Sequence, residues 1–255
     1  MSGQFFEIVR RSVLQTLRQP ALIVPPIAFP LMLLAINAGG LDAATALPGF
    51  PADSYLDFAI AVPFIQGALF AMINAGSSLA RDVETGFLKR LAMTPMQRGA
   101  LLAGNLAGVM AVALLSALIY LAVGFAVGMS FPAGVLGVPA LLALALLIAL
   151  AFASLGALVG LRSGSGEAVQ GFFPLFFILL FLSSMALPRP LIEQDWFRFI
   201  ATYNPVSYLI EGIRSFMVTG WDGEALALGF GIAAVVAVAG VTAAAGALRT
   251  RLVRT

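Results

Sequence analysis

The chain has 255 residues, of which 61% are hydrophobic and only 10% charged, and its formal net charge is +2. A soluble domain has roughly 45–50% apolar and about 25% charged residues, so this apolar surplus cannot be covered by a polar surface and must face lipid. The chain contains neither Cys nor His, which excludes disulfides, a thiolate nucleophile and Ser–His or Cys–His catalysis. The small, dispersed charge also disfavours nucleic-acid binding.

The N-terminal segment, residues 1–20, predicts an amphipathic helix over residues 3–18. Apolar and polar side chains recur there at helical spacing on opposite faces. The apolar face carries Phe6, Val9, Val13 and Leu17, and the polar face carries Glu7, Arg11, Gln15 and Arg18. Such a helix lies in the plane of the membrane interface. Two interpretations remain open, a simple anchor or an anchor that also contacts a cytoplasmic partner.

Six apolar stretches are long enough to cross a hydrocarbon core of about 30 Å, given a rise of about 1.5 Å per residue. They are Ala21–Ala38, Asp57–Leu79, Ala103–Met129, Pro139–Leu161, Gly171–Leu187 and Ala225–Leu248. The fifth is short and requires local thinning of the bilayer or a polar flank. A cleaved signal peptide is the alternative for the first stretch, since Ala44-Thr45-Ala46 has the spacing of a cleavage site. The long charged lead-in favours a retained span.

The basic residues alternate between successive loops. Eleven of the 14 Lys and Arg residues lie in the two termini and in the loops after the second and fourth stretches. Because positive side chains near helix ends stay on the cytoplasmic side, this pattern predicts that both termini are cytoplasmic. The expected location is therefore a bacterial cytoplasmic, or inner, membrane.

The segment 188–223 is too long for a turn and too apolar for a solvated loop. It predicts two helices, Leu191–Tyr203 and Pro205–Thr219, separated where Asn204 caps the second one. We expect both to dip into the outer leaflet without crossing it. Glu211 and Arg214 are three residues apart on the second helix, and we expect them to pair with each other near the outer mouth.

The densest charged stretch is the cytoplasmic segment 81–95, inside the loop 80–100. It predicts a short helix with Phe87, Leu88 and Leu91 on one face and the basic pair Lys89 and Arg90 on the other. Held stiffly between two spans, such a helix can transmit motion from a docked protein. The alternative is a positive loop without a partner.

These residues carry a family resemblance. The pattern Arg81-Asp82-x-Glu84-x-Gly86-x-x-x-Arg90-Leu91-x-x-Thr94-Pro95 and the later pattern Asn204-Pro205-x-x-Tyr208-x-x-Glu211-x-x-Arg214 are similar to signatures of ABC-2 type permeases. The six-span plan, the leading helix and the re-entrant pair also resemble that family, over the whole of 1–255 as one transmembrane domain. Phe87-Leu88-Lys89 departs from the Thr-Leu-Glu that many members have after the glycine.

The resemblance implies an all-α polytopic exporter subunit that moves a drug-like hydrophobic molecule or a lipid. It implies a second permease copy, most simply in a homodimer, and two ABC ATPase subunits that carry ATP and Mg²⁺, with no cofactor in this chain. A phosphate-binding loop needs Gly-Lys-Ser or Gly-Lys-Thr, and the single lysine lies between Leu88 and Arg90. The implied ATPase-coupling residues are Arg81, Asp82, Glu84, Gly86, Lys89 and Arg90, and the implied outer-gate residues are Asn204, Pro205, Tyr208, Glu211 and Arg214.

Four residues are candidates for the translocation path. Gln66 is costly to bury in a span and needs a polar partner or a hydrated cavity, and helix–helix hydrogen bonding is its alternative role. Phe173, Phe177 and Phe181 form one stripe of the fifth stretch, which suits an apolar path, a lipid-facing surface or a dimer contact. Because Tyr and Trp are absent from that stripe, the pattern favours hydrophobic substrates over sugars.

Three other functions compete with this hypothesis. A lipid-linked polysaccharide exporter would use the same architecture. An ion-coupled secondary transporter is disfavoured because no ionisable residue falls in the middle of a predicted span. An intramembrane enzyme using Ser163 or Ser165 is disfavoured because no histidine is available to act as a base.

Overall fold

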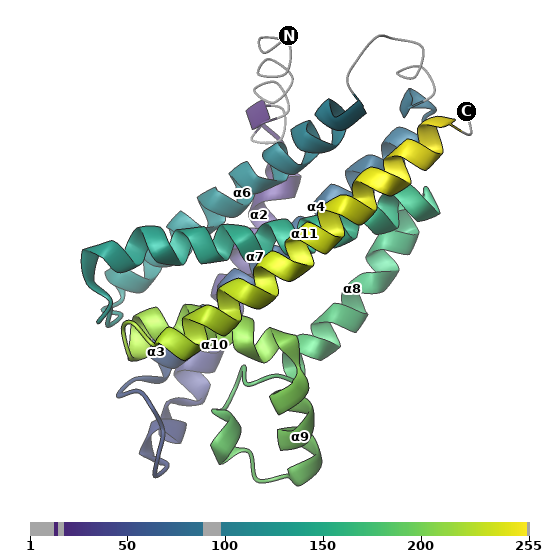
Figure 1. Ribbon diagram of the computed structural model, residues 1–255. Helices are drawn as coiled ribbons and strands as arrows, with labels where there is room; N and C mark the ends of the chain where they lie inside the picture. Colours follow the sequence, from purple (N-terminus) through teal and green to yellow (C-terminus); the bar gives the residue numbers. More distant parts are fainter. Residues whose placement is uncertain (1–12, 15–17, 89–97, 254–255) are drawn as a thin grey trace.

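The computed structural model describes residues 13–14, 18–88 and 98–253 (Figure 1). These ranges consist of helices and connecting segments and contain no strand. Most of the predicted amphipathic helix, together with Lys89 and Arg90, lies outside the described residues.

The helices follow one another along the chain with short connections. In order they are α2 (Pro20–Gly40), η1 (Asp42–Ala46), α3 (Tyr55–Ala59), α4 (Ala61–Glu84), α6 (Arg98–Ala126), α7 (Gly134–Ser163), α8 (Gly166–Phe181), η2 (Arg189–Leu191), α9 (Asp195–Tyr203), α10 (Pro205–Val218) and α11 (Gly223–Val253). Within the described residues, five segments are long and apolar enough to cross a membrane: Pro20–Gly40, Tyr55–Glu84, Gly99–Ala126, Gly134–Ser163 and Gly223–Arg251. The chain is therefore a multi-pass helical membrane protein.

The fifth predicted span, Gly171–Leu187, differs from the structure at both ends. α8 has 16 residues and starts at Gly166, because Ser165 caps it by accepting a hydrogen bond from the Ala168 amide at 3.3 Å. It ends at Phe181, which gives a length of about 24 Å, short of the roughly 30 Å hydrocarbon core. The structure therefore supports five full-length spans and leaves the sixth as an expectation.

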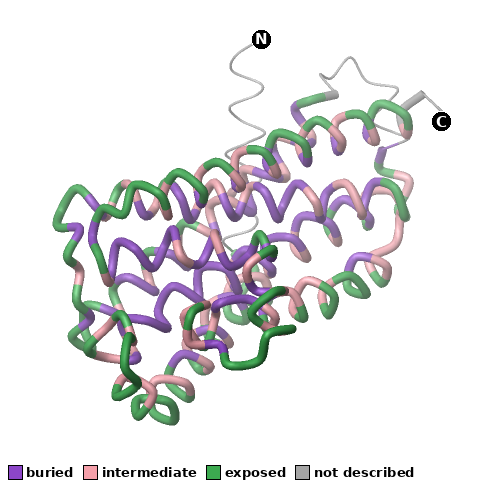
Figure 2. Tube along the Cα trace, turned by 60° about the horizontal axis from the view of Figure 1, so that its bottom comes forward, coloured by how far each residue is buried: buried purple, intermediate pink, exposed green. Residues whose placement is uncertain are grey.

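α4 is the central helix of the bundle. In its most apolar window 78% of the residues are buried, against 17% for α2 and 22% for α11. Figure 2 shows buried residues concentrated along the middle helices and exposed residues along the outer ones. The outer helices expose apolar side chains such as Met32 and Val235, as expected for surfaces that face lipid.

Three glycines allow α4 and α7 to pack backbone against backbone. A Cβ atom at Gly156 would lie 2.0 Å from the Met72 carbonyl oxygen, and one at Gly160 would lie 2.2 Å from the Gly76 carbonyl oxygen. Any side chain at these positions would force the helices apart. The Gly156-x-x-x-Gly160 pair therefore serves packing within one subunit.

Hydrogen bonds from charged side chains join helices at two ends of the bundle, and Figure 1 shows how the helices run between these ends. At one, here called the Gly86 end, the end of α4, the α7–α8 turn and the end of α11 meet. At the other, here called the Arg214 end, α3, α9, α10 and the α6–α7 connection meet.

Candidate functional site

At the Gly86 end, three of the predicted coupling residues form the last turn of α4. Arg81, Asp82 and Glu84 continue the spanning helix, so the first part of the predicted coupling segment 81–95 belongs to α4, and most of its remainder lies outside the described residues. At the end of the helix, the amide and the hydroxyl of Thr85 both donate to the Arg81 carbonyl, at 3.0 and 2.8 Å. Gly86 follows with φ at +68°, a conformation that other residues rarely adopt. Because the turn at Gly86 directly follows α4, a displacement of this turn would act directly on the central helix.

Glu84 connects α4 to the start of α8. Its Oε1 accepts a hydrogen bond from the Gly166 amide at 3.3 Å. A carboxylate at a helix N-terminus interacts favourably with the helix dipole. The contact joins two helices whose residues are 82 positions apart in sequence.

Arg251 holds the end of α11 against the end of α7. Its Nε donates to the Leu161 carbonyl at 2.8 Å, and its Nη2 donates to the Arg162 carbonyl at 2.7 Å. Both carbonyls belong to the last turn of α7, where a cation is favourable. Arg251 belongs to the basic C-terminal tail that indicates orientation; it lies beyond the predicted end of the sixth stretch at Leu248, and it gains this role because α11 continues to Val253.

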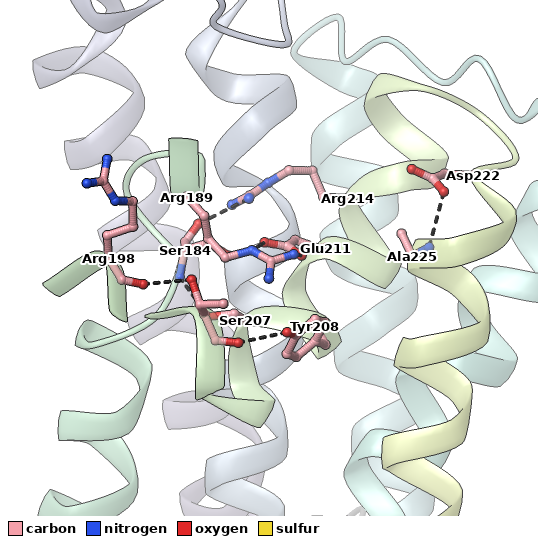
Figure 3. Close-up of polar contacts among 10 residues, drawn as sticks. Ser184, Arg189, Arg198, Ser207, Tyr208, Glu211, Arg214, Asp222 and Ala225 are labelled. Carbon is pink, nitrogen blue, oxygen red and sulfur yellow. Dashed lines mark hydrogen bonds and ion pairs between the residues drawn. The ribbon is translucent and has the colours of Figure 1, made fainter. Parts of the chain in front are cut away.

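At the Arg214 end, Arg214 is buried and satisfied by backbone carbonyls. Its Nε donates to Phe58 at 2.9 Å, its Nη1 to Ser184 at 3.1 Å and its Nη2 to Met185 at 3.2 Å. The guanidinium carbon also lies 3.5 Å from the centre of the Phe58 ring. One side chain thus joins α10, α3 and the non-helical segment after α8. Figure 3 shows Arg214 and one of its partners, Ser184.

The predicted pairing of Glu211 with Arg214 is wrong. Glu211 instead accepts two hydrogen bonds from Arg189, at 2.9 Å from Nε and 2.5 Å from Nη2. The guanidinium of Arg189 also lies 4.6 Å from the centre of the Tyr208 ring. The physical reason is that Arg214 extends toward three carbonyls inside the bundle, which frees the Glu211 carboxylate for the arginine of η2.

The junction between α9 and α10 matches the predicted cap. The Oδ1 of Asn204 accepts from the Val206 amide at 2.9 Å, and Pro205 is the first residue of α10. The Nδ2 of Asn204 donates to the Leu179 and Leu182 carbonyls, at 2.6 and 3.0 Å, and so ties the junction to the end of α8. The first helix of the pair starts at Asp195, four residues later than expected. Its last turn receives a hydrogen bond from the Tyr208 hydroxyl to the Thr202 carbonyl at 2.7 Å.

Gln66 faces a small cavity near the Arg214 end. The side chain is buried, its Oε1 has no hydrogen-bond partner among the described residues, and it lines a cavity of about 20 Å³ together with Asn37 and Tyr55. That volume holds about one water molecule. Tyr55, which the sequence analysis did not single out, donates from its hydroxyl to the Ala186 carbonyl at 2.9 Å.

The phenylalanine stripe of α8 is part of a larger aromatic cluster. The ring centres of Phe173 and Phe177 lie 5.3 Å apart, and those of Phe177 and Phe181 lie 5.1 Å apart. Phe70 of α4 reaches Phe173 at 6.0 Å, and Phe29 of α2 reaches Phe177 at 6.2 Å. The cluster extends from α8 to α2 and α4, with Phe181 exposed at its end.

The polar side chains at the two ends of the bundle mainly contact helix ends. Within the described ranges, no group of three or more acidic side chains is arranged to hold a metal ion. The charged side chains instead make capping and carbonyl contacts that join helices. Such contacts can position and couple helices.

Comparison with known proteins relates the chain to one family. The model of the family described as ABC-2 type transporter matches residues 3–218. A daunorubicin resistance ABC transporter permease protein, DrrB1, of Streptomyces coeruleorubidus is 26% identical over 223 residues, which covers 85% of this chain and 75% of the relative.

Two further relatives carry the name putative transport permease ycf38. The protein from Cyanophora paradoxa is 25% identical over 212 residues, covering 83% of this chain and 73% of its own length. The protein from Porphyra purpurea is 27% identical over 218 residues, covering 84% and 74% respectively.

Proposed function

Because the chain belongs to the ABC-2 type transporter family, we propose that it is the membrane subunit of an ATP-driven exporter. Two copies would form the translocation path, and two separate ATPase subunits would bind and hydrolyse ATP with Mg²⁺. The family match over residues 3–218 is the observation that carries this proposal. The dense helix contacts at the Gly86 end support it, because they give an attached ATPase a rigid point of action.

The route of coupling follows from two contacts. A push on the turn at Gly86 acts on α4 directly and on α8 through the hydrogen bond between Glu84 and the Gly166 amide. Arg251 holds α7 and α11 together at the same end. Movement of one end of the bundle would therefore be shared by four helices and reach the Arg214 end as a tilt.

The proposed substrate is a hydrophobic small molecule. The aromatic cluster of α8, α4 and α2 offers apolar surface for such a compound, and one relative is named for resistance to daunorubicin. Because the cluster contains phenylalanines and no sugar-stacking Tyr or Trp, it gives less support to a lipid-linked polysaccharide. Both substrate classes share the same coupling scheme.

The test is reconstitution in proteoliposomes with and without candidate ATPase subunits. We expect movement of a hydrophobic amine dye only when the ATPase and ATP are both present. Movement driven by an ion gradient without any ATPase would contradict the proposal and favour a secondary transporter.

A crosslinking experiment tests the docking site separately. The chain has no cysteine, so a single Phe87→Cys substitution places one thiol beside Gly86, at a side chain that is 38% exposed. We expect a bifunctional thiol–amine reagent to link it to the ATPase. The matched control is Trp196→Cys on α9, exposed at the opposite end, which should give no such product.

A further inference from the structure

A second, larger cavity opens at the Arg214 end. It has a volume of about 310 Å³ and lies between η2, α10 and the start of α11. Its charged lining consists of Arg189, Glu211, Arg214, Asp222 and Glu224. Cations and carboxylates are thus present in one pocket, and the cavity is far larger than the one at Gln66.

Arg189 of η2 and the two carboxylates at the start of α11, Asp222 and Glu224, reach the pocket from different elements. Glu211 takes up the Nε and Nη2 donors of Arg189, which leaves Nη1 of Arg189 for another acceptor. Asp222 caps α11 through Oδ1, which accepts from the Glu224 and Ala225 amides at 3.1 Å each, so its second oxygen remains for a donor. Figure 3 shows Asp222 set apart from Arg189 and Glu211, at the start of α11.

The aromatic residues exposed at this end are typical of the headgroup region of a membrane. Trp221, directly before Asp222, is 55% exposed, and its Nε1 donates to the Ala133 carbonyl at 3.2 Å. Trp196 and Tyr203 of α9 are also exposed at this end. Trp and Tyr collect where a membrane meets water, with their rings at the headgroup level.

Apolar side chains lie beside the charged groups of the pocket and further along α11. Val218 and Leu228 line the cavity beside its charges. Further along α11, Val235 and Val238 are exposed, on a helix whose composition suits a membrane span. Charged groups for a polar head and apolar side chains for an acyl chain thus lie on the same helix, α11.

We propose that this pocket binds the headgroup of a zwitterionic phospholipid that carries a primary ammonium. The ammonium would donate to Asp222 and Glu224, and the phosphate would accept from Arg189, both as charge-assisted hydrogen bonds. An anionic headgroup would meet Asp222 and Glu224 without a cation of its own to pair with them, and a simple cation would leave Nη1 of Arg189 without an acceptor. The site concerns a membrane component and does not depend on the proposed export function.

Native mass spectrometry of the delipidated full chain tests the ligand. The probes are phosphatidylethanolamine, phosphatidylcholine and phosphatidylglycerol with identical acyl chains. We expect phosphatidylethanolamine to bind about tenfold more tightly than the other two, because the trimethylammonium of phosphatidylcholine donates no N–H hydrogen bond and phosphatidylglycerol has no cation. Equal affinities for the three lipids would overturn the proposal. Displacement of the lipid by free phosphoethanolamine at equal concentration would also overturn it, because it would show a site for a soluble zwitterion.

Two substitutions test the residues. Asp222→Asn retains an N-cap side chain for α11 and, combined with Glu224→Gln, removes both carboxylates. We expect this pair of changes to abolish the preference for phosphatidylethanolamine over phosphatidylcholine while the circular dichroism spectrum stays unchanged. Asp195→Asn, on the exposed start of α9, is the matched control and should keep the preference. An unchanged preference in the double variant would overturn the assignment.

Discussion

Arg189 and Glu211, 22 residues apart in sequence, form a two-point ion pair that ties η2 to α10 at the Arg214 end. The side chains of the pair are 27% and 21% exposed, so water screens the attraction only in part. The geometry is bidentate, in which two parallel N–H···O bonds fix the relative position of the two groups. This pair, and not the expected pair of Glu211 with Arg214 within α10, holds η2 against α10 in the segment between α8 and α11.

The Arg189–Glu211 pair predicts a measurable coupling energy. In a double-mutant cycle of Arg189→Ala and Glu211→Ala, we expect a coupling of about 1–2 kcal/mol in the free energy of unfolding in detergent. The value lies above that of an open surface pair because the pair is partly buried and bidentate. The control cycle uses Asp195 and Arg198, which pair at the exposed start of α9, and should give less than about 0.5 kcal/mol. Equal couplings in the two cycles would contradict this reading.

Arg214 is expected to tolerate no substitution, including lysine. Lysine retains the charge but cannot direct three donors in a fork toward Phe58, Ser184 and Met185. We expect Arg214→Lys to lower the free energy of unfolding by about 2 kcal/mol or more, because buried carbonyls lose their donors. Thermal unfolding followed by tryptophan fluorescence measures the loss. Arg198→Lys is the control and should leave the midpoint unchanged, and a similar midpoint for both variants would refute the assigned role.

The α4–α7 contact predicts a sharp difference between glycines. Gly160→Ala places a methyl group where the Gly76 carbonyl oxygen lies 2.2 Å away, so we expect a loss of about 2 kcal/mol or more from forced separation of the helices. Gly171→Ala is the matched control, because its Cβ would meet nothing within 4 Å and alanine favours a helix. Thermal midpoints in detergent compare the two variants. A stable Gly160→Ala protein would show that the contact is looser than described.

The charge pattern predicts which end faces the cytoplasm. With a membrane-impermeant maleimide on intact spheroplasts, we expect Trp196→Cys to be labelled and Phe87→Cys to be labelled only after permeabilisation. Both side chains are exposed, so reactivity reports the side of the membrane and not burial. Labelling of Phe87→Cys in intact spheroplasts would reverse the proposed orientation.

Features governed by neighbouring residues could be predicted from the sequence. The cap at Asn204 and the start of α10 at Pro205 each depend on side-chain and backbone preferences within a few residues. The long apolar runs likewise predicted the helices, because length and hydropathy alone decide whether a segment suits a membrane. Their ends were less well predicted: α4 continues to Glu84, and α8 starts at Gly166.

Composition, the order of the helices and the family motifs were thus determined by the sequence alone, because each depends on the local pattern of side chains. Only the tertiary structure decided that Glu211 binds Arg189, that Arg214 serves three carbonyls, and that Gly156 and Gly160 face α4. A charged side chain pairs with the groups that lie within hydrogen-bonding distance once the helices have packed. Spacing along a helix indicates which side chains of that helix could come into contact. The fold determines which donors and acceptors are buried away from water, and buried groups are costly unless they form hydrogen bonds.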